Sequence, residues 1–192
     1  MPRRAPKSLA GTIVKTLTLD APVERVYRAF TERRDLEQWL AEPYPLDLRE
    51  GGDFEFGQKA DGHMTGGTFL EVEPNKRLVY TWRFTVFDPK TRKRVPNWSE
   101  ERPTKVTVTF ARAGKGTKVT IHHEGFPEGA AEYWPHEVGW EMLVGDVLRK
   151  YLEVPRKEFD AWWAAEGEAW QQRFNATVGE RAAGPAKKPS RS

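Results

Sequence analysis

Residues 137–152 read Glu137-Val-Gly-Trp-Glu-Met-Leu-Val-Gly-Asp-Val-Leu-Arg-Lys-Tyr-Leu152, and the predicted fold is built around this segment. Apolar side chains recur in it at steps of three and four residues, beginning at Trp140. That spacing is typical of a helix with one apolar face. The helix is expected to end before Pro155, because proline removes a helical hydrogen bond. The stretch therefore predicts a long amphipathic helix that must lie on an apolar surface.

That surface is predicted to be a sheet built from the strand patterns that precede the helix. Residues 11–19 alternate between apolar and polar side chains and indicate a first strand. Six further candidates, bounded by turn residues, lie at 46–49, 53–58, 67–73, 78–87, 104–111 and 118–124. Their short connections favour antiparallel pairing, since parallel strands need long crossovers. The charged segment 88–103 is interpreted as an extended hairpin loop.

Two short helices are expected between the first strand and the others. Val23, Val26, Tyr27 and Phe30 follow Pro22 at helical spacing, and a shorter helical piece covers 35–40. The order of elements predicts the α+β class. In this arrangement a curved antiparallel sheet of about six to seven strands wraps around the long C-terminal helix.

The chain of 192 residues suits one domain, expected at 11–153, with appendages. Residues 1–10 and 182–192 are interpreted as a disordered basic arm and a disordered basic tail, and 154–181 as an amphipathic helical extension rich in tryptophan. The two ends carry enough lysine and arginine, without any acid, to leave the middle of the chain negative. A nucleic-acid partner is therefore not expected, because it would need a basic stripe on the folded body.

Several classes of protein and of site are disfavoured by what the sequence lacks. Cysteine is absent, which excludes disulfides, thiolate metal sites and cysteine nucleophiles. No stretch is apolar for long enough to span a membrane, and the first residues lack a secretory apolar region, so a cytoplasmic location is the default expectation. His136-Glu137 begins like a zinc-protease helix, but Trp140 stands where the second histidine would be. No catalytic residue, metal ligand or cofactor is assigned.

Several pieces of the chain follow one another in the order of a known superfamily. They are 17–30, Leu36-Glu-Gln-Trp39, 47–54, 71–82, 116–121, His123-Glu-Gly-Phe126 and Gly139-Trp140. In these pieces the chain resembles the START-like (SRPBCC) superfamily, and more narrowly the branch related to the C-terminal domain of the activator of the 90-kDa heat-shock protein ATPase. The resemblance covers about 12–153 and implies a helix-grip fold with a hydrophobic cavity between the sheet and the last helix. Loop 88–103 and the residues after 153 exceed the family pattern.

Aromatic side chains are the candidates for the walls of that cavity. Tyr80, Trp82 and Phe84 share one face of a predicted strand. His123 shares a face with Val119 and Ile121, so we expect it to enter the pocket region. The full set of pocket candidates is Trp39, Phe54, Phe56, Tyr80, Trp82, Phe84, His123, Phe126, Trp140 and Val144. Packing in the core without a ligand is the alternative interpretation of each of them.

Three functions are left open by the sequence. The first is binding of a small hydrophobic molecule in the cavity, with no chemistry of its own. The second, implied by the resemblance, is a protein-interaction module or a chaperone co-factor in the stress response, with a protein partner or a homodimer held through the Trp-rich C-terminal helix. The third is a cyclase, lyase or hydrolase acting on an aromatic or polyketide-like substrate, with His123 and either Tyr80 or Glu124 as acid and base.

Overall fold

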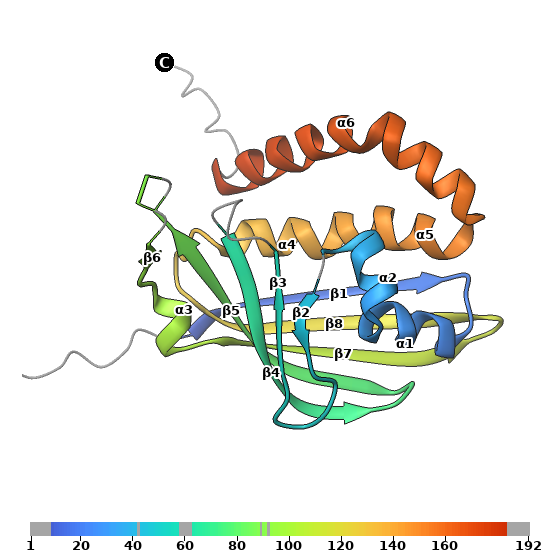
Figure 1. Ribbon diagram of the computed structural model, residues 1–192, viewed down its shortest axis with the longest axis horizontal. Helices are drawn as coiled ribbons and strands as arrows, with labels where there is room; N and C mark the ends of the chain where they lie inside the picture. Colours follow the sequence, from blue (N-terminus) through green and yellow to red (C-terminus); the bar gives the residue numbers. More distant parts are fainter. Residues whose placement is uncertain (1–8, 42, 58–62, 89, 92, 184–192) are drawn as a thin grey trace, which may run out of the picture.

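A computed structural model describes residues 9–41, 43–57, 63–88, 90–91 and 93–183 of the chain. Most of the arm and tail expected at 1–10 and 182–192 lies outside these residues. The described part is layered, as Figure 1 shows, with a curved sheet below, one helical rod across it and a second long helix above the rod. The predicted α+β class and the sheet wrapped around a long helix are confirmed.

The sheet is antiparallel and has eight strands in the described residues. In chain order they are β1 (Leu9–Leu19), β2 (Pro43–Leu46), β3 (Asp53–Phe56), β4 (His63–Glu73), β5 (Arg77–Phe87), β6 (Arg94–Val95), β7 (Thr104–Ala113) and β8 (Gly116–Pro127). Their order across the sheet is β1-β8-β7-β5-β4-β3-β2, and β6 pairs with β5 beside this path. The two predicted short helices follow β1 as α1 (Val23–Thr31) and α2 (Arg33–Trp39).

Strand β2 lies earlier in the chain than the candidate at 46–49, because it begins at Pro43. It contains two prolines, which cannot donate a backbone hydrogen bond. Its place at the end of the strand order tolerates them, since an edge strand needs partners on one side alone.

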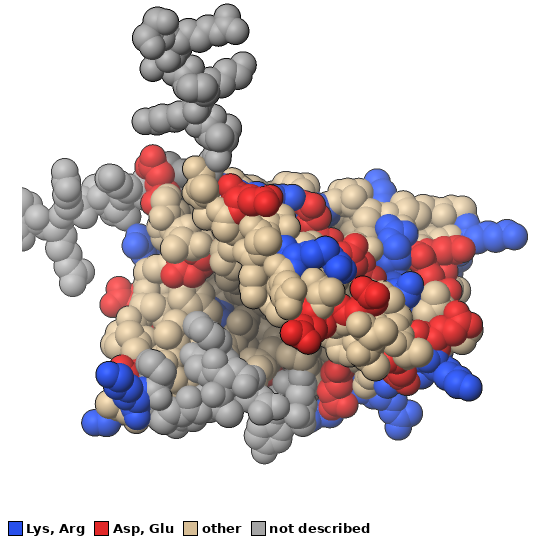
Figure 2. All heavy atoms as spheres, turned by 90° about the horizontal axis from the view of Figure 1, so that it is seen from above, with Lys and Arg blue, Asp and Glu red and all other residues tan. Residues whose placement is uncertain are grey.

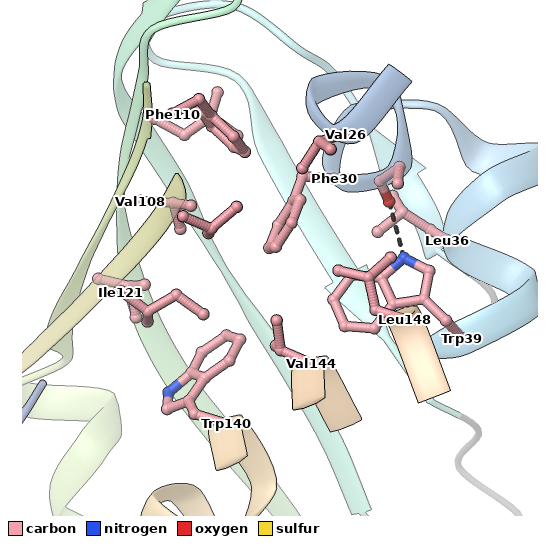
Figure 3. Packing of buried hydrophobic residues seen from close by; sticks show 14 of the residues in the cluster. Val26, Phe30, Leu36, Trp39, Val108, Phe110, Ile121, Trp140, Val144 and Leu148 are labelled. Carbon is pink, nitrogen blue, oxygen red and sulfur yellow. Dashed lines mark hydrogen bonds between the residues drawn. The ribbon is translucent and has the colours of Figure 1, made fainter. Parts of the chain in front are cut away.

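The rod over the sheet is helical from Tyr133 to Glu153, but its middle is not an α-helix. It consists of α4 (Tyr133–Met142), a π-helical segment η2 (Leu143–Leu148) and α5 (Arg149–Glu153). Figure 3 shows Trp140, Val144 and Leu148 pointing from the rod into the buried cluster. Each of them is at most 5% exposed. Opposite them lie side chains of the sheet and of α1 and α2, including Phe30, Trp39, Val108, Phe110 and Ile121.

The segment 88–103 folds back on the sheet. It contributes β6 and a single helical turn, α3 (Trp98–Glu101), whose N-cap Asn97 accepts a hydrogen bond from the Ser99 backbone N–H. The Ser99 hydroxyl is fully buried and donates to the Phe84 carbonyl over 3.1 Å, and the Asn97 side-chain amide donates to the same carbonyl over 3.0 Å. These hydrogen bonds hold the helical turn α3 against the end of β5.

Helix α6 (Arg156–Ala183) turns back after Pro155 and runs along the outer side of the rod (Figure 1). Near its start Phe159 packs on Tyr151, with ring centroids 5.4 Å apart. At its far end Arg181 pairs with Glu137 and Glu141 of α4, and Lys15 of β1 pairs with the same two carboxylates. Hydrogen bonds from the two cations lower the pKa of Glu141 to about 2. No helix in the described parts of the chain is long and apolar enough to cross a membrane.

One buried hydroxyl in the core has no hydrogen-bond partner among the described residues. It belongs to Tyr27 of α1, whose side chain packs edge-on against Phe110 with ring centroids 5.4 Å apart. Burial also raises the pKa of this phenol. A buried polar group without a partner costs the free energy of its lost hydration.

We therefore expect Tyr27→Phe to raise the free energy of unfolding by about 1 kcal/mol, since it removes that cost and keeps the ring. Urea denaturation followed by circular dichroism measures the change. Tyr151→Phe is the matched control, because the Tyr151 hydroxyl donates to Asp35, and its loss is expected to destabilise the fold. A lower stability for Tyr27→Phe would show that its hydroxyl has a partner in solution.

Candidate functional site

An apolar cavity lies between the rod, the helices α1 and α2, and the strands β2–β5. Its walls share an apolar and mostly aromatic character, and they are Phe30, Leu36, Trp39, Leu40, Leu46, Phe54, Phe56, Phe69, Tyr80, Trp82 and Trp140. Phe54 is central to these walls, with its ring centroid 5.0–5.3 Å from those of Phe56, Phe69 and Tyr80. The cavity itself measures about 20 Å³, which is room for about one water molecule.

A larger and more open hollow of about 290 Å³ adjoins the cavity. It is lined by Leu40, Ala41, Phe56, Gly57, Met64, Thr65 and Trp82. Leu40, Phe56 and Trp82 line both spaces, so these three side chains form the partition between them. Trp82 is held by its hydrogen bond to His136, so a rotation of Leu40 and Phe56 would be needed to join the cavity and the hollow into one space.

Six of the ten residues singled out in the sequence lie in the wall of the cavity: Trp39, Phe54, Phe56, Tyr80, Trp82 and Trp140. The other four are placed elsewhere. Phe84 packs against Trp98 of α3, Phe126 against His123, and Val144 is fully buried beneath the rod. His123 lies behind the aromatic wall, with its ring centroid 6.1 Å from that of Trp82.

Five wall residues were not singled out by sequence reasoning, namely Phe30, Leu36, Leu40, Leu46 and Phe69. Phe30 and Leu36 carry a signal, because they stand on the apolar faces of the two predicted short helices. No local pattern shows that these faces meet the far strands of the sheet.

Tyr80 contributes the one hydroxyl in the cavity wall. The other polar groups of the wall side chains are indole N–H groups, and each has an acceptor: the Ala29 carbonyl for Trp39, His136 for Trp82 and His123 for Trp140. Among the described residues, no hydrogen bond is found for the Tyr80 hydroxyl. Burial raises the pKa of this phenol, so the hydroxyl remains protonated at neutral pH.

Two indole–imidazole hydrogen bonds join the rod to the sheet in opposite directions. Trp140 of α4 donates to Nδ1 of His123 on β8 over 3.0 Å. Trp82 of β5 donates to Nε2 of His136 on α4 over 2.8 Å. The rod and the sheet thus supply one tryptophan and one histidine each. An indole N–H can only donate, so each bond requires a ring nitrogen without a proton.

The remaining ring nitrogens are also occupied. The Thr104 hydroxyl donates to the Trp82 carbonyl over 2.9 Å, so it accepts from Nε2 of His123, which lies 2.7 Å away. Nδ1 of His136 donates to the Glu132 carbonyl over 2.7 Å. These contacts assign a neutral tautomer to each imidazole.

The electrostatics agree with two neutral imidazoles. Burial lowers the pKa of His123 well below its usual value, and charge on His136 and His122 would lower it further. Burial likewise lowers the pKa of His136, against the opposing effect of the Glu132 carbonyl. Neither histidine has a free nitrogen with which to exchange a proton with a ligand in the cavity. These two residues therefore supply no acid or base to the cavity.

The two neutral histidines predict that stability depends on pH. In the unfolded chain they bind protons near pH 6.5, whereas in the folded chain their pKa values are lower. Below that pH the unfolded state therefore binds more protons than the folded state, and the free energy of unfolding decreases as the pH decreases. We expect a loss of up to about 1.4 kcal/mol per pH unit from each histidine as the pH falls from about 6.5 to about 5.

Urea denaturation at a series of pH values measures this slope. His136→Gln is expected to reduce it, because this variant removes one of the two buried imidazoles. The Glu141 carboxylate has a pKa of about 2 and protonates at lower pH than this interval. A stability that is constant over the interval would mean that the two imidazoles are not held neutral.

Comparisons with known proteins agree on one family. Residues 20–153 match the family model described as "Activator of Hsp90 ATPase homolog 1-like protein". The human activator of 90 kDa heat shock protein ATPase homolog 1 is 27% identical over 137 residues, which is 71% of this chain and 35% of the human protein. The chain spans about a third of the length of the curated relatives it matches.

Solved structures give the same result for the fold. Protein CV1439 from Chromobacterium violaceum is 28% identical, and the match covers 76% of this chain and 99% of that one with a TM-score of 0.58. CalU16 from Micromonospora echinospora is 23% identical, and the match covers 88% of each chain with a TM-score of 0.57. The rod, the two short helices and the strands β2–β8 all lie within the residues that the family model matches, and the chain belongs to the family of proteins like the activator of Hsp90 ATPase homolog 1.

Proposed function

We propose that this chain binds a small, flat hydrophobic molecule that carries one hydrogen-bond acceptor, and that it does so without catalysing a reaction. The observation that carries the proposal is the Tyr80 hydroxyl, which stands without a described partner in an otherwise apolar and aromatic wall. Small-molecule sites are mostly apolar and have few, well-placed polar groups that orient the ligand. A carbonyl or ether oxygen of the ligand would accept the hydrogen bond from Tyr80.

The ligand must occupy more than the inner cavity. At about 20 Å³ the cavity holds no organic molecule, whereas the adjoining hollow of about 290 Å³ approaches the lower limit of known ligand sites. The proposal therefore requires Leu40 and Phe56 to move aside on binding, so that the molecule reaches Tyr80 while Trp82 keeps its hydrogen bond to His136. Phe56 and Leu40 are only partly buried, which favours their movement.

A catalytic role receives less support from the site. The sequence suggested His123 as an acid or base, with Tyr80 or Glu124. Both nitrogens of His123 are occupied, and Glu124 is partly exposed on the outer face of the sheet, where its hydrogen bond with Lys105 lowers its pKa. The phenol of Tyr80 is held in its neutral form.

A chaperone co-factor is the second candidate, because the human relative is named an activator of the 90 kDa heat shock protein ATPase. The Trp-rich helix gives it limited support as a contact surface. Phe159 and Trp170 of α6 are buried against the chain's own rod, and Trp163 is the one large aromatic side chain among the described residues that is more than a third exposed. A partner or a second copy would meet a helix whose apolar side chains are mostly covered.

The proposal is tested with two matched probes, 2-acetylnaphthalene and 2-ethylnaphthalene, which differ in the carbonyl oxygen. Isothermal titration calorimetry is expected to show the ketone binding about five- to ten-fold more tightly, the equivalent of about 1 kcal/mol for one hydrogen bond. Tyr80→Phe should abolish this difference and leave the hydrocarbon affinity unchanged. Equal affinities for both probes in the wild type would remove Tyr80 from the site.

A second pair of variants tests the location. Leu46→Trp fills the cavity from its wall and is expected to weaken both probes at least ten-fold. Leu48→Trp is the control, because Leu48 is exposed and lies outside the cavity wall. Thermal denaturation checks that both variants fold. Unchanged binding to a folded Leu46→Trp protein would contradict the proposed function.

A further inference from the structure

We propose a second binding site in the cleft between α6 and the end of the rod, with a small organic anion that carries a flat apolar group, such as an aromatic carboxylate, as its ligand. The cleft measures about 430 Å³, which lies within the range of known small-molecule sites. It is lined by Gly145, Asp146, Arg149, Lys150, Glu153, Val154, Trp162, Trp170 and Arg173. None of these residues lines the aromatic cavity described above.

The antiparallel course of α6 builds this cleft. The Trp170 indole donates to Asp146 of η2 over 3.2 Å, and the Lys150 ammonium lies 5.2 Å from the centroid of the Trp162 ring. These two contacts hold α6 to the rod on either side of an open space. The family match ends at residue 153, so one wall of the cleft comes from a helix outside the matched residues.

The charges in the cleft favour an anion. Of its three cations, Arg149 is committed to the Glu153 carboxylate over 3.2 Å and to the Gly145 carbonyl over 3.1 Å. Lys150 and Arg173 have no carboxylate partner among the described residues. Figure 2 looks onto the α6 side of the molecule and shows basic side chains standing beside acidic ones there. Two cations that line the same cleft and have no carboxylate partner there are available to the carboxylate of a ligand.

The remaining walls explain the flat apolar group. Val154, Trp162 and Trp170 contribute apolar surface, and Lys150 already shows that the Trp162 ring face accepts a cation. Asp146 is the one acid of the cleft without a cation partner, and its bond to the Trp170 indole is the contact that places it there. Its negative charge opposes the binding of an anion. Removing the charge of Asp146 should therefore strengthen binding, whereas removing that of Lys150 or Arg173 should weaken it.

The test uses 2-naphthoate as the probe and its neutral methyl ester as the matched control. Titration into isotope-labelled full-length protein is followed by nuclear magnetic resonance at the tryptophan indole N–H signals. We expect naphthoate to shift the signals of Trp162 and Trp170 and to leave those of Trp82 and Trp140 unchanged. At the Trp162 and Trp170 signals the ester should bind at least five-fold more weakly, because it cannot pair with a cation; any binding of the ester in the aromatic cavity appears at Trp82 and Trp140 instead. The indole signals that shift therefore distinguish binding in this cleft from binding in the aromatic cavity.

Variants then identify the recognising groups. Lys150→Gln and Arg173→Gln are each expected to weaken naphthoate binding by about three- to five-fold, and Lys157→Gln, an exposed charge on α6 outside the cleft, by less than two-fold. Asp146→Asn keeps an acceptor for the Trp170 indole and should tighten binding. The proposal is overturned if naphthoate shifts neither indole, if the ester binds equally well, or if the Lys150 and Arg173 variants bind like wild type.

Discussion

Two indole–imidazole hydrogen bonds form a joint between the rod and the sheet, and the packing of both layers relies on it. Trp140 of the rod donates a hydrogen bond to His123 of the sheet, and Trp82 of the sheet donates one to His136 of the rod. Because an indole can only donate, both histidines must remain neutral for the joint to hold. The joint fixes how closely the rod approaches the sheet, and therefore how much space the aromatic wall leaves.

The same joint occupies both buried histidines. The groups that could move a proton are used to hold the helix, while the side chains that face the cavity are apolar except for one phenol. Outside the joint, α6 adds an outer layer that is fastened by ion pairs at one end and by aromatic packing at the other. The family model ends before this helix begins, whereas the match to CalU16 covers 88% of the chain and therefore extends beyond residue 153.

The sequence predicts the layers of the fold, and it predicts six of the eleven residues in the cavity wall. The spacing around Trp140 and the alternation that leads to His123 are local patterns, and both residues are buried where the patterns place them. The partners of His123 lie 17 and 19 residues away in the chain, and no period connects them. Phe84 shares a strand face with Trp82, yet it packs on α3, a single turn too short to give a periodic signal. Leu40 directly follows α2 and Leu46 ends β2, and both reach the cavity only through the tertiary fold.

The π-helical segment η2 has a consequence for how this chain is aligned with its relatives. A π-turn holds one residue more than an α-turn, so it amounts to a single-residue insertion absorbed inside the rod. Against any homologue whose last helix is regular throughout, a gap belongs between 143 and 148. Without that gap, Trp140 and its neighbours would be paired correctly while Tyr151 and everything after it would be compared one position out of step.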